Sequence, residues 1–338
     1  MGSYTLSPEG RQAYDKFSAA LHRAVGVPRG HEFAVDPSVV QTLYEKIEED
    51  GNPFLKRINS GVLVTELKGE KIGMSLTGPV TSRTDTNQDG VERKARHLVN
   101  LDGLPFELFK QNMDFAIKYS RIDAWKRFKN FREMYNKLVR KGIGNDRLRI
   151  GWNGTSVGAT TDPVTTPDLS DVNIGWLKLI ERDAISQRDD TAFEIGGTGG
   201  PANLDVLVHE MKDLLHPNYR DDPDLVVMIS RNILSTEEAA YHTAQGRRPT
   251  EKEKLMGNVL TSTYGKLPSD VPPFFPDGHI MITPYANLSV YTQEDSWRRK
   301  LEDNPKKDQY EDFNSANIGY VVEDYQAVAL LTNVSHSG

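Results

Sequence analysis

Ser156 lies at the centre of the sequence "GTSVG", residues 154–158, which matches the G-x-S-x-G pattern of serine hydrolases. That pattern needs a strand before the serine and a helix after it, so that the hydroxyl is exposed at a sharp turn. Here a predicted helix and a Trp152-Asn153-Gly154 turn precede Ser156, and a loop rich in threonine and proline follows it. A serine hydrolase built on Ser156 is therefore a minor alternative, which predicts turnover of an ester probe and its loss in Ser156→Ala.

The other groups that resemble catalytic or binding motifs lack the required spacing. In "HEMKDLLH", His209 and His216 are seven residues apart, whereas a zinc pair on one helix face needs histidines four apart. The tract "GGTGGP", residues 196–201, lacks the Gly-Lys-Ser/Thr of a phosphate-binding loop and is interpreted as a connector. The sequence therefore predicts neither an enzyme nor a metal or cofactor site.

The composition is that of an ordinary globular protein. The 338 residues, 37% of them hydrophobic and 26% charged, suit two domains with a sizeable core. A net charge of −7 argues against a dedicated nucleic-acid binder, and the lack of cysteine excludes disulfides and thiolate chemistry. No apolar run approaches the roughly 18 residues of a membrane span, and no signal-peptide core is present. We expect a soluble chain without a membrane partner.

The N-terminal third predicts two helices and a long hairpin. Ser7-Pro8 marks the start of the first helix, and Asp36-Pro37 marks the start of the second. Between residues 61 and 97, two alternating segments flank a turn at Lys68-Gly69-Glu70, and a charged loop follows. Because a lone hairpin is at best marginally stable in water, this one needs another surface to pack against.

Residues 122–140 carry the strongest helical pattern, with a broad apolar face. Gly142 and Gly144 are expected to interrupt it before a helical continuation through Ile150. Between residues 118 and 149, eleven basic residues stand against three acidic ones. This basic face is a solvated surface, a contact between copies, or a non-specific contact with a polyanion.

The C-terminal half predicts an α/β unit followed by strands. Leu204 to Leu215 form an amphipathic helical pattern, and the apolar run "DLVVMIS" predicts a buried strand. The segments "HIMIT", "NLSVYT", "YVVEDY" and "QAVALLTNV" predict further strands.

Seven blocks of this sequence resemble the major capsid proteins of P2-like tailed bacteriophages. The first begins "DPSVVQTLYEKI" and extends through "FLKRIN" to "ELKGEKIGMSLTGPVTSRTDT". The others are "RIDAWKRF", "GWNGTS", "DVNIGWLK", "DPDLVVMISRNIL", "NLSVYTQEDSWRR" and "DNPKKDQYEDFNSANIGYVVEDY". They occur in the family's order, from about Val35 to Leu331. Residues before this span resemble the family only in forming a helical arm.

The resemblance implies an α+β fold, the HK97-like major capsid fold, and the function of a major capsid protein. Such a protein self-assembles into pentamers and hexamers that form an icosahedral head around double-stranded DNA. The implied parts are an N-terminal arm (1–33), an N-arm of the mature protein (34–60), an E-loop hairpin (61–100), a peripheral domain with the spine helix (101–200), an axial domain (201–284) and return strands of the peripheral domain (285–338). An encapsulin-type shell, which would enclose a cargo protein, is the alternative.

The resemblance also implies why the hairpin has little core, because it would lie over a neighbouring subunit. Its mixed charges would then pair across that interface. These residues are Arg83, Asp85, Asp89, Glu92, Arg93 and Arg96.

Members of the family commonly lose an N-terminal segment to a phage-encoded maturation protease, and the junction expected here lies between Phe33 and Ala34. The basic residues expected on the inner face are Lys126, Arg127, Arg132 and Arg140. The implied partners are further copies of the chain, a scaffold, the maturation protease, the portal protein and packaged DNA held without base readout. The implied location is the virion, after assembly in the host cytoplasm.

Overall fold

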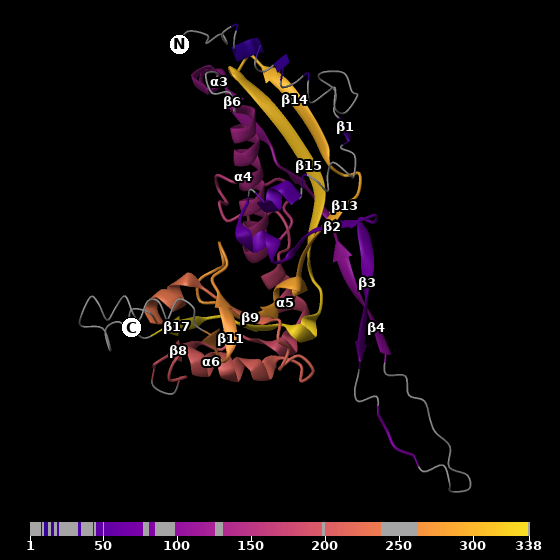
Figure 1. Cartoon of the computed structure of the whole chain (residues 1–338), viewed down its shortest axis with the longest axis vertical. Helices are drawn as coiled ribbons and strands as arrows, with labels where there is room; N and C mark the ends of the chain where they lie inside the picture. Colours follow the sequence, from indigo (N-terminus) through magenta and orange to yellow (C-terminus); the bar gives the residue numbers. More distant parts are fainter. Residues whose placement is uncertain are drawn as a thin grey trace, which may run out of the picture.

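The computed structural model describes most of the chain. The described residues are 8, 10–12, 15–16, 19, 33–34, 43, 45–49, 51–76, 81–84, 99–125, 131–197, 200–237 and 263–336. They form two large sheets, each packed against helices, a small two-stranded sheet, and one long hairpin that projects from the body (Figure 1).

The larger sheet has seven strands and is built around the long strand β15. Its strands are β1 (Phe33–Ala34), β2 (Asn59–Val64), β5 (Phe109–Asn112), β6 (Phe115–Lys118), β13 (Leu288–Gln293), β14 (Arg298–Asn304) and β15 (Gln309–Val322). Their order is β1-β14-β15-β13-β2, and β5 and β6 also pair with β15. All pairs are antiparallel except β13 with β2.

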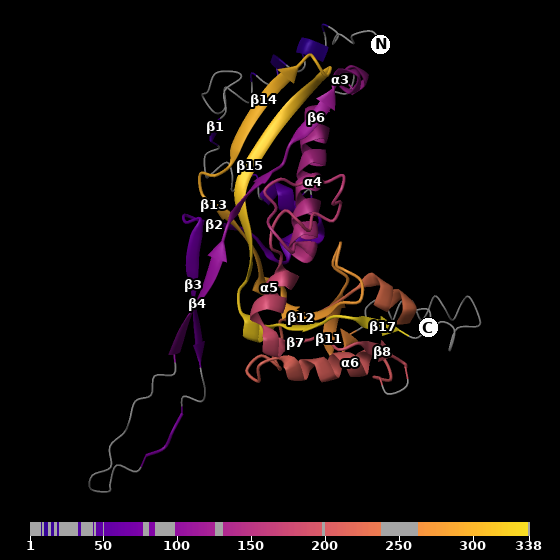
Figure 2. The same cartoon turned by 180° about the vertical axis from the view of Figure 1, so that it is seen from behind.

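Three helices accompany this sheet. They are α3 (Tyr119–Trp125), α4 (Phe131–Asn153) and α5 (Trp176–Asp183). The core between α4, α5 and the sheet contains the buried indoles of Trp152, Trp176 and Trp297. Figure 2 shows α4 running along the sheet beside β15.

The expected break at Gly142 and Gly144 is wrong, because α4 continues through both residues to Asn153. A Cβ on Gly144 would lie 3.0 Å from Leu55 Cδ1, and one on Gly151 would lie 2.3 Å from the Trp176 ring. The glycines at 144 and 151 let neighbouring elements approach the helix closely, and this packing outweighs their low helix propensity.

The smaller sheet has six strands in the order β10-β11-β9-β12-β16-β7. Its strands are β7 (Arg188–Asp189), β9 (Leu225–Ile229), β10 (Thr263–Tyr264), β11 (Leu267–Asp270), β12 (Ile280–Pro284) and β16 (Ala329–Leu331). Helix α6 (Leu204–Met211) packs its apolar side into the second core, and β8 (Phe193–Ile195) pairs with β17 (Val334–His336). Residues 231–237 are also helical.

The hairpin consists of β3 (Lys68–Leu76) and β4 (Val99–Glu107), which pair antiparallel along their whole length. The predicted turn at Lys68-Gly69-Glu70 is therefore wrong, because these residues lie inside β3. The segment before it, β2, belongs to the larger sheet, where it pairs with β13. Alternation alone could not distinguish a hairpin strand from a sheet strand. Among the described residues, no helix is both long and apolar enough to cross a membrane.

Candidate functional site

The root of the hairpin is the part of the molecule that fixes the direction of the projecting arm. On one face, Phe106 of β4 packs edge-on against Tyr291 of β13, with the ring centroids 5.3 Å apart. Leu108 and Val321 belong to the same small apolar cluster, and Val62 and Val64 of β2 pack against it. Gly69 lies opposite Phe106 in the β3–β4 pair, and a Cβ on Gly69 would lie 2.7 Å from the Phe106 ring, so a side chain here would force that ring to move.

A polar network centred on Glu323 ties β3 to the end of β15. The Lys71 ammonium pairs with the Glu323 carboxylate and donates a hydrogen bond to its backbone carbonyl at 2.6 Å. Ser289 Oγ and Tyr291 OH donate to the same carboxylate, at 2.5 and 3.0 Å. Burial, with the nearby Glu323 charge, raises the pKa of Tyr291, so its hydroxyl stays a proton donor. Both charged side chains of the pair are 23% exposed, which favours a stronger contact than a fully solvated ion pair.

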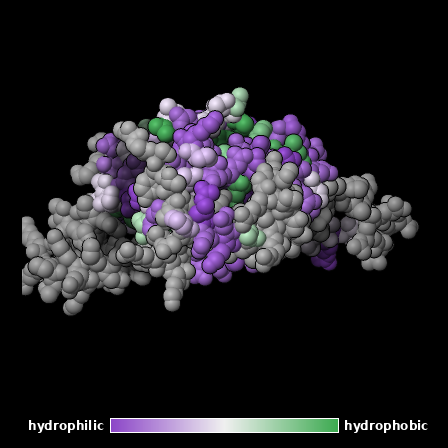
Figure 3. All heavy atoms as spheres, turned by 90° about the horizontal axis from the view of Figure 1, so that it is seen from above, coloured by the Kyte–Doolittle hydropathy of each residue, from purple (hydrophilic) through white to green (hydrophobic). Residues whose placement is uncertain are grey.

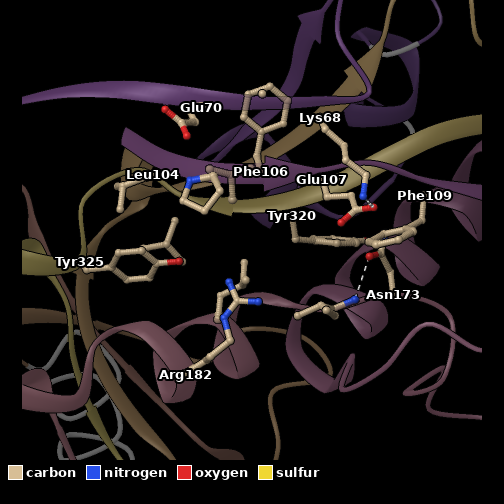
Figure 4. Close-up of a pocket in the computed structure, with 16 residues that line it drawn as sticks. Lys68, Glu70, Leu104, Phe106, Glu107, Phe109, Asn173, Arg182, Tyr320 and Tyr325 are labelled. Carbon is tan, nitrogen blue, oxygen red and sulfur yellow. Dashed lines mark hydrogen bonds and ion pairs between the residues drawn. The ribbon is translucent and has the colours of Figure 1, made fainter. Parts of the chain in front are cut away.

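A cavity of about 520 Å³ lies beside this root, between the hairpin and α5. In Figure 4, Glu70, Leu104 and Phe106 border it from the hairpin, while Arg182 borders it from the helix. Arg182 is itself held by a bidentate ion pair with Asp183, both contacts 2.7 Å long. The hairpin is thus attached to the body at its root, where the cavity lies between it and α5 (Figure 4).

Replacing Lys71 by methionine is expected to loosen this attachment. A hydrogen bond to a charged group contributes about 1.5–3 kcal/mol, so amide protection in β3 should fall by about tenfold or more. Hydrogen exchange of the β3 amides measures this change. Lys68→Met is the matched control, because Lys68 pairs with Glu107 on the exposed surface, where ion pairs contribute about 0–1 kcal/mol. Equal protection in the two variants would contradict the role given to Glu323.

Most of the hairpin charges predicted from the sequence for assembly lie outside the described residues. Arg83 lies in residues 81–84, which are exposed and carry no regular secondary structure. The remaining predicted hairpin charges lie outside the described residues: Asp85, Asp89, Glu92, Arg93 and Arg96.

The structure places some of the other residues predicted from the sequence and leaves two undescribed. Phe33 and Ala34 form β1 on the edge of the larger sheet, and Arg140 is half-buried on α4. Arg132 belongs to the first turn of α4. Lys126 and Arg127 lie outside the described residues.

Sequence reasoning missed Lys71 and Glu323 as partners. The two residues are 252 positions apart, and no local motif marks either of them. Only the pairing of β13 with β15 brings Ser289 and Tyr291 beside Glu323.

The residues with possible catalytic chemistry are not organised into a site. Ser156 is exposed in a loop after α4, and the backbone around it is held by hydrogen bonds to Ser170 rather than by a strand-turn-helix elbow. His209 is exposed on α6. Within the described residues, no cluster of three or more His, Asp or Glu side chains could hold a metal ion.

Comparison with known proteins shows which family of proteins this chain belongs to. Residues 13–334 match the family described as phage major capsid protein, P2 family. The chain belongs to this P2 family of phage major capsid proteins. It is 36% identical to the capsid proteins of Escherichia phage P2 over 94% of this chain and 93% of that protein. It is 29% identical to the major capsid protein of Serratia phage KSP20, over 96% of each.

Solved structures agree with this family. The chain superimposes on a chain of a satellite phage P4 procapsid that includes a size determination protein. The TM-score is 0.78 at 34% identity, with 96% of this chain and 98% of that chain covered. A more distant capsid, that of an empty GTA particle, matches with a TM-score of 0.51 at 11% identity over 83% of this chain and 89% of that chain. These likenesses confirm the α+β, HK97-like capsid fold expected from the sequence.

Membership of the P2 capsid family gives the protein a structural role as a major capsid protein. The enzyme alternative on Ser156 is not supported, because the family is one of shell proteins. Its relatives are components of the virion capsid, and the related capsid structures are self-assembled shells.

Proposed function

We propose that this capsid protein assembles into pentamers and hexamers of an icosahedral head that encloses double-stranded DNA. The observation that supports this proposal is the hairpin of β3 and β4, which pairs along nine residue positions while contacting its own subunit at the root. An isolated two-stranded hairpin of this kind is marginal in water, so a neighbouring subunit is the natural surface for it.

In this proposal the hairpin is the E-loop and lies over the adjacent subunit. Arg83 and the predicted charges beyond it, Asp85, Asp89, Glu92, Arg93 and Arg96, then form exposed ion pairs across the interface. Each such pair contributes only about 0–1 kcal/mol, but the shell repeats it in every subunit. Weak single contacts also let a wrongly placed subunit leave before the shell closes.

The N-terminal arm is proposed to be temporary. A maturation protease would cut between Phe33 and Ala34, where β1 presents the chain in an extended conformation at a sheet edge. A scaffold and a portal protein are the further proposed partners, and assembly would take place in the host cytoplasm before the protein becomes part of the virion. The proposed domain limits stay those stated from the sequence.

The basic surface of α4 is proposed to contact packaged DNA. Lys137 and Lys141 are exposed on this helix, and Arg140 beside them is half-buried. Lys126, Arg127 and Arg132, which precede these residues in the sequence, belong to the same proposal. Such contacts with phosphate carry no base information, which suits a shell that packages DNA irrespective of sequence.

Negative-stain electron microscopy with sedimentation, on the purified chain alone and with its scaffold and protease partners, tests the assembly proposal. Closed particles, or rings of five or six subunits, are the expected result. If the particles contained a cargo protein and no DNA after expression with the packaging machinery, an encapsulin-type shell would replace the proposed DNA container.

A further inference from the structure

Strand β14 presents an open edge at the outer margin of the larger sheet. One side of β14 pairs with β15 along its whole length, from Arg298 with Ser315 to Asn304 with Gln309. On the other side, β1 pairs only with Arg298 and Arg299. From Lys300 to Asn304, no strand in the described part of the chain covers this edge. Figures 1 and 2 both show β14 at the margin, with β1 next to it.

The charges along β14 are arranged in two halves of opposite sign. The strand reads Arg298, Arg299, Lys300, Leu301, Glu302, Asp303, Asn304. Alternate residues face the interior, where Leu301 is 6% exposed and Arg299 forms a bidentate ion pair with Asp312. Lys300 and Glu302 face outward, with their side chains 35% and 41% exposed, and in the single subunit they pair with each other. Pairing with a second copy would exchange this contact within the strand for two contacts between strands.

This pattern is complementary to itself when the strand is reversed. In an antiparallel pair of two β14 strands centred on Leu301, Lys300 of each strand lies opposite Glu302 of the other. Arg299 likewise lies opposite Asp303. Opposite charges directly across an antiparallel pair are favourable, and like charges are unfavourable. A self-complementary patch is what a two-fold interface between identical subunits requires.

We propose that the edge of β14 pairs with β14 of a second copy of this chain, across a two-fold axis through Leu301. The contact would add backbone hydrogen bonds between the sheets of two subunits, and the charges would fix its register. Figure 3 looks onto the upper end of the molecule in Figure 1, and the described surface there is mainly hydrophilic with a few hydrophobic patches, which agrees with a polar contact in this region.

The N-terminal arm would control when this edge is available. Strand β1 occupies the Arg298–Arg299 end of the edge, which the second β14 also needs. Farther along the arm, Arg11 lies 3.8 Å from Asp303 at the opposite end of the strand. The arm and the second copy therefore exclude each other. If the arm is removed as in the proposed function, on which this step rests, cleavage between Phe33 and Ala34 removes the residue that pairs with Arg299 and the contact of Arg11 with Asp303. Ala34 is then the only β1 residue left at the Arg298 end of the edge.

Engineered cysteines test the pairing directly, because the chain has no cysteine of its own. Lys300→Cys and Glu302→Cys chains, differently tagged, are mixed, assembled and oxidised. Opposite residues in an antiparallel pair have Cα atoms about 4.5–5.5 Å apart, within the range of a disulfide. In the proposed register, the Cα atoms at position 300 of the two copies are about 8 Å apart, beyond that range. We expect at least about tenfold more cross-linked dimer in the mixture than in either variant alone.

Charge exchange provides a second, independent test. In the proposed register, position 298 of one copy lies opposite position 304 of the other, so an Arg298→Cys chain and an Asn304→Cys chain should cross-link. Lys300→Glu or Glu302→Lys alone, carried by both chains, places like charges opposite each other and should reduce this cross-link. The double exchange Lys300→Glu/Glu302→Lys restores complementarity and should restore the cross-link. Both side chains are partly exposed, and thermal unfolding checks that each variant folds.

The arm is tested in the full chain by Ala34→Pro, which removes a backbone N–H from the two-residue strand β1. With Lys300→Cys and Glu302→Cys chains as before, we expect more disulfide between positions 300 and 302 in this variant than in the Ala34→Ser control. Equal disulfide yields in the Ala34→Pro and Ala34→Ser variants would overturn the proposal that the arm covers the edge.

The outcomes separate this inference from the assembly proposal. Closed particles without the disulfide between positions 300 and 302 would overturn the edge pairing and leave the shell function standing. In that case the charges on β14 would serve to prevent pairing, as charges on edge strands often do. A chain that forms no particles and no dimers would overturn both.

Discussion

Replacing Trp176 by alanine is expected to lower the free energy of unfolding by about 3–5 kcal/mol, the usual cost of deleting a buried tryptophan side chain. Trp176 is fully buried where α5 meets α4 and the larger sheet. Its ring packs edge-on against Trp152 and Tyr320, with centroids 4.9 and 5.3 Å away, and its Nε1 donates to the Ser289 carbonyl at 2.9 Å. Removing the indole leaves a cavity and deletes the hydrogen bond to the Ser289 carbonyl. Chemical denaturation followed by circular dichroism measures the change.

Ile185→Ala is the control for this stability measurement, because Ile185 lies just after α5 but is 70% exposed. An exposed substitution of this kind should change the free energy of unfolding by no more than about 0.5 kcal/mol. A loss below about 1 kcal/mol for Trp176→Ala would show that the junction of α4, α5 and the sheet does not hold the fold as described.

Reversing the charges of Arg93 and Arg96 to glutamate is expected to abolish closed particles while the subunit stays folded. Both residues belong to the charged loop of the hairpin predicted from the sequence and lie outside the described residues. Each reversed residue changes an attraction into a repulsion of about 0–1 kcal/mol, and the shell repeats that change in every subunit. Electron microscopy of the assembly reaction measures particle yield, and thermal unfolding confirms that the subunit folds.

The matched control reverses two exposed charges on the smaller-sheet side of the molecule, as Arg231→Glu/Lys266→Glu. It changes the net charge by the same amount, and the proposal gives these two residues no part in the hairpin interface. Particles formed normally by Arg93→Glu/Arg96→Glu would refute the role assigned to the hairpin charges. Equal loss in both variants would attribute the defect to net charge alone.

Local patterns in the sequence predicted many of the elements correctly. The apolar periodicity of α6 and the continuous apolar run of β9 both specify their elements through residues close together in the chain. The ordered family blocks also predicted the capsid fold. Element limits were less predictable: α4 continues through Gly142 and Gly144, because contacts with Leu55 and with neighbouring backbone favour a residue without a side chain at position 144.

Long-range pairing explains why the hairpin root could not be predicted. The segments β2 and β3 both alternate, yet β2 joins β13 in parallel while β3 pairs with β4 across the charged loop. The Lys71–Glu323 contact depends on the fold of the whole larger sheet. The open edge of β14 likewise becomes visible only when its neighbours β15 and β1 are known.

The central claim, that the hairpin finds its partner on another subunit, is tested most directly by an electron cryomicroscopy reconstruction of assembled particles. We predict that β3 and β4 of one subunit lie over the larger sheet of its neighbour, with Lys71 still paired to Glu323 of its own chain. A hairpin folded back onto its own subunit, in particles that are nonetheless closed, would contradict this claim.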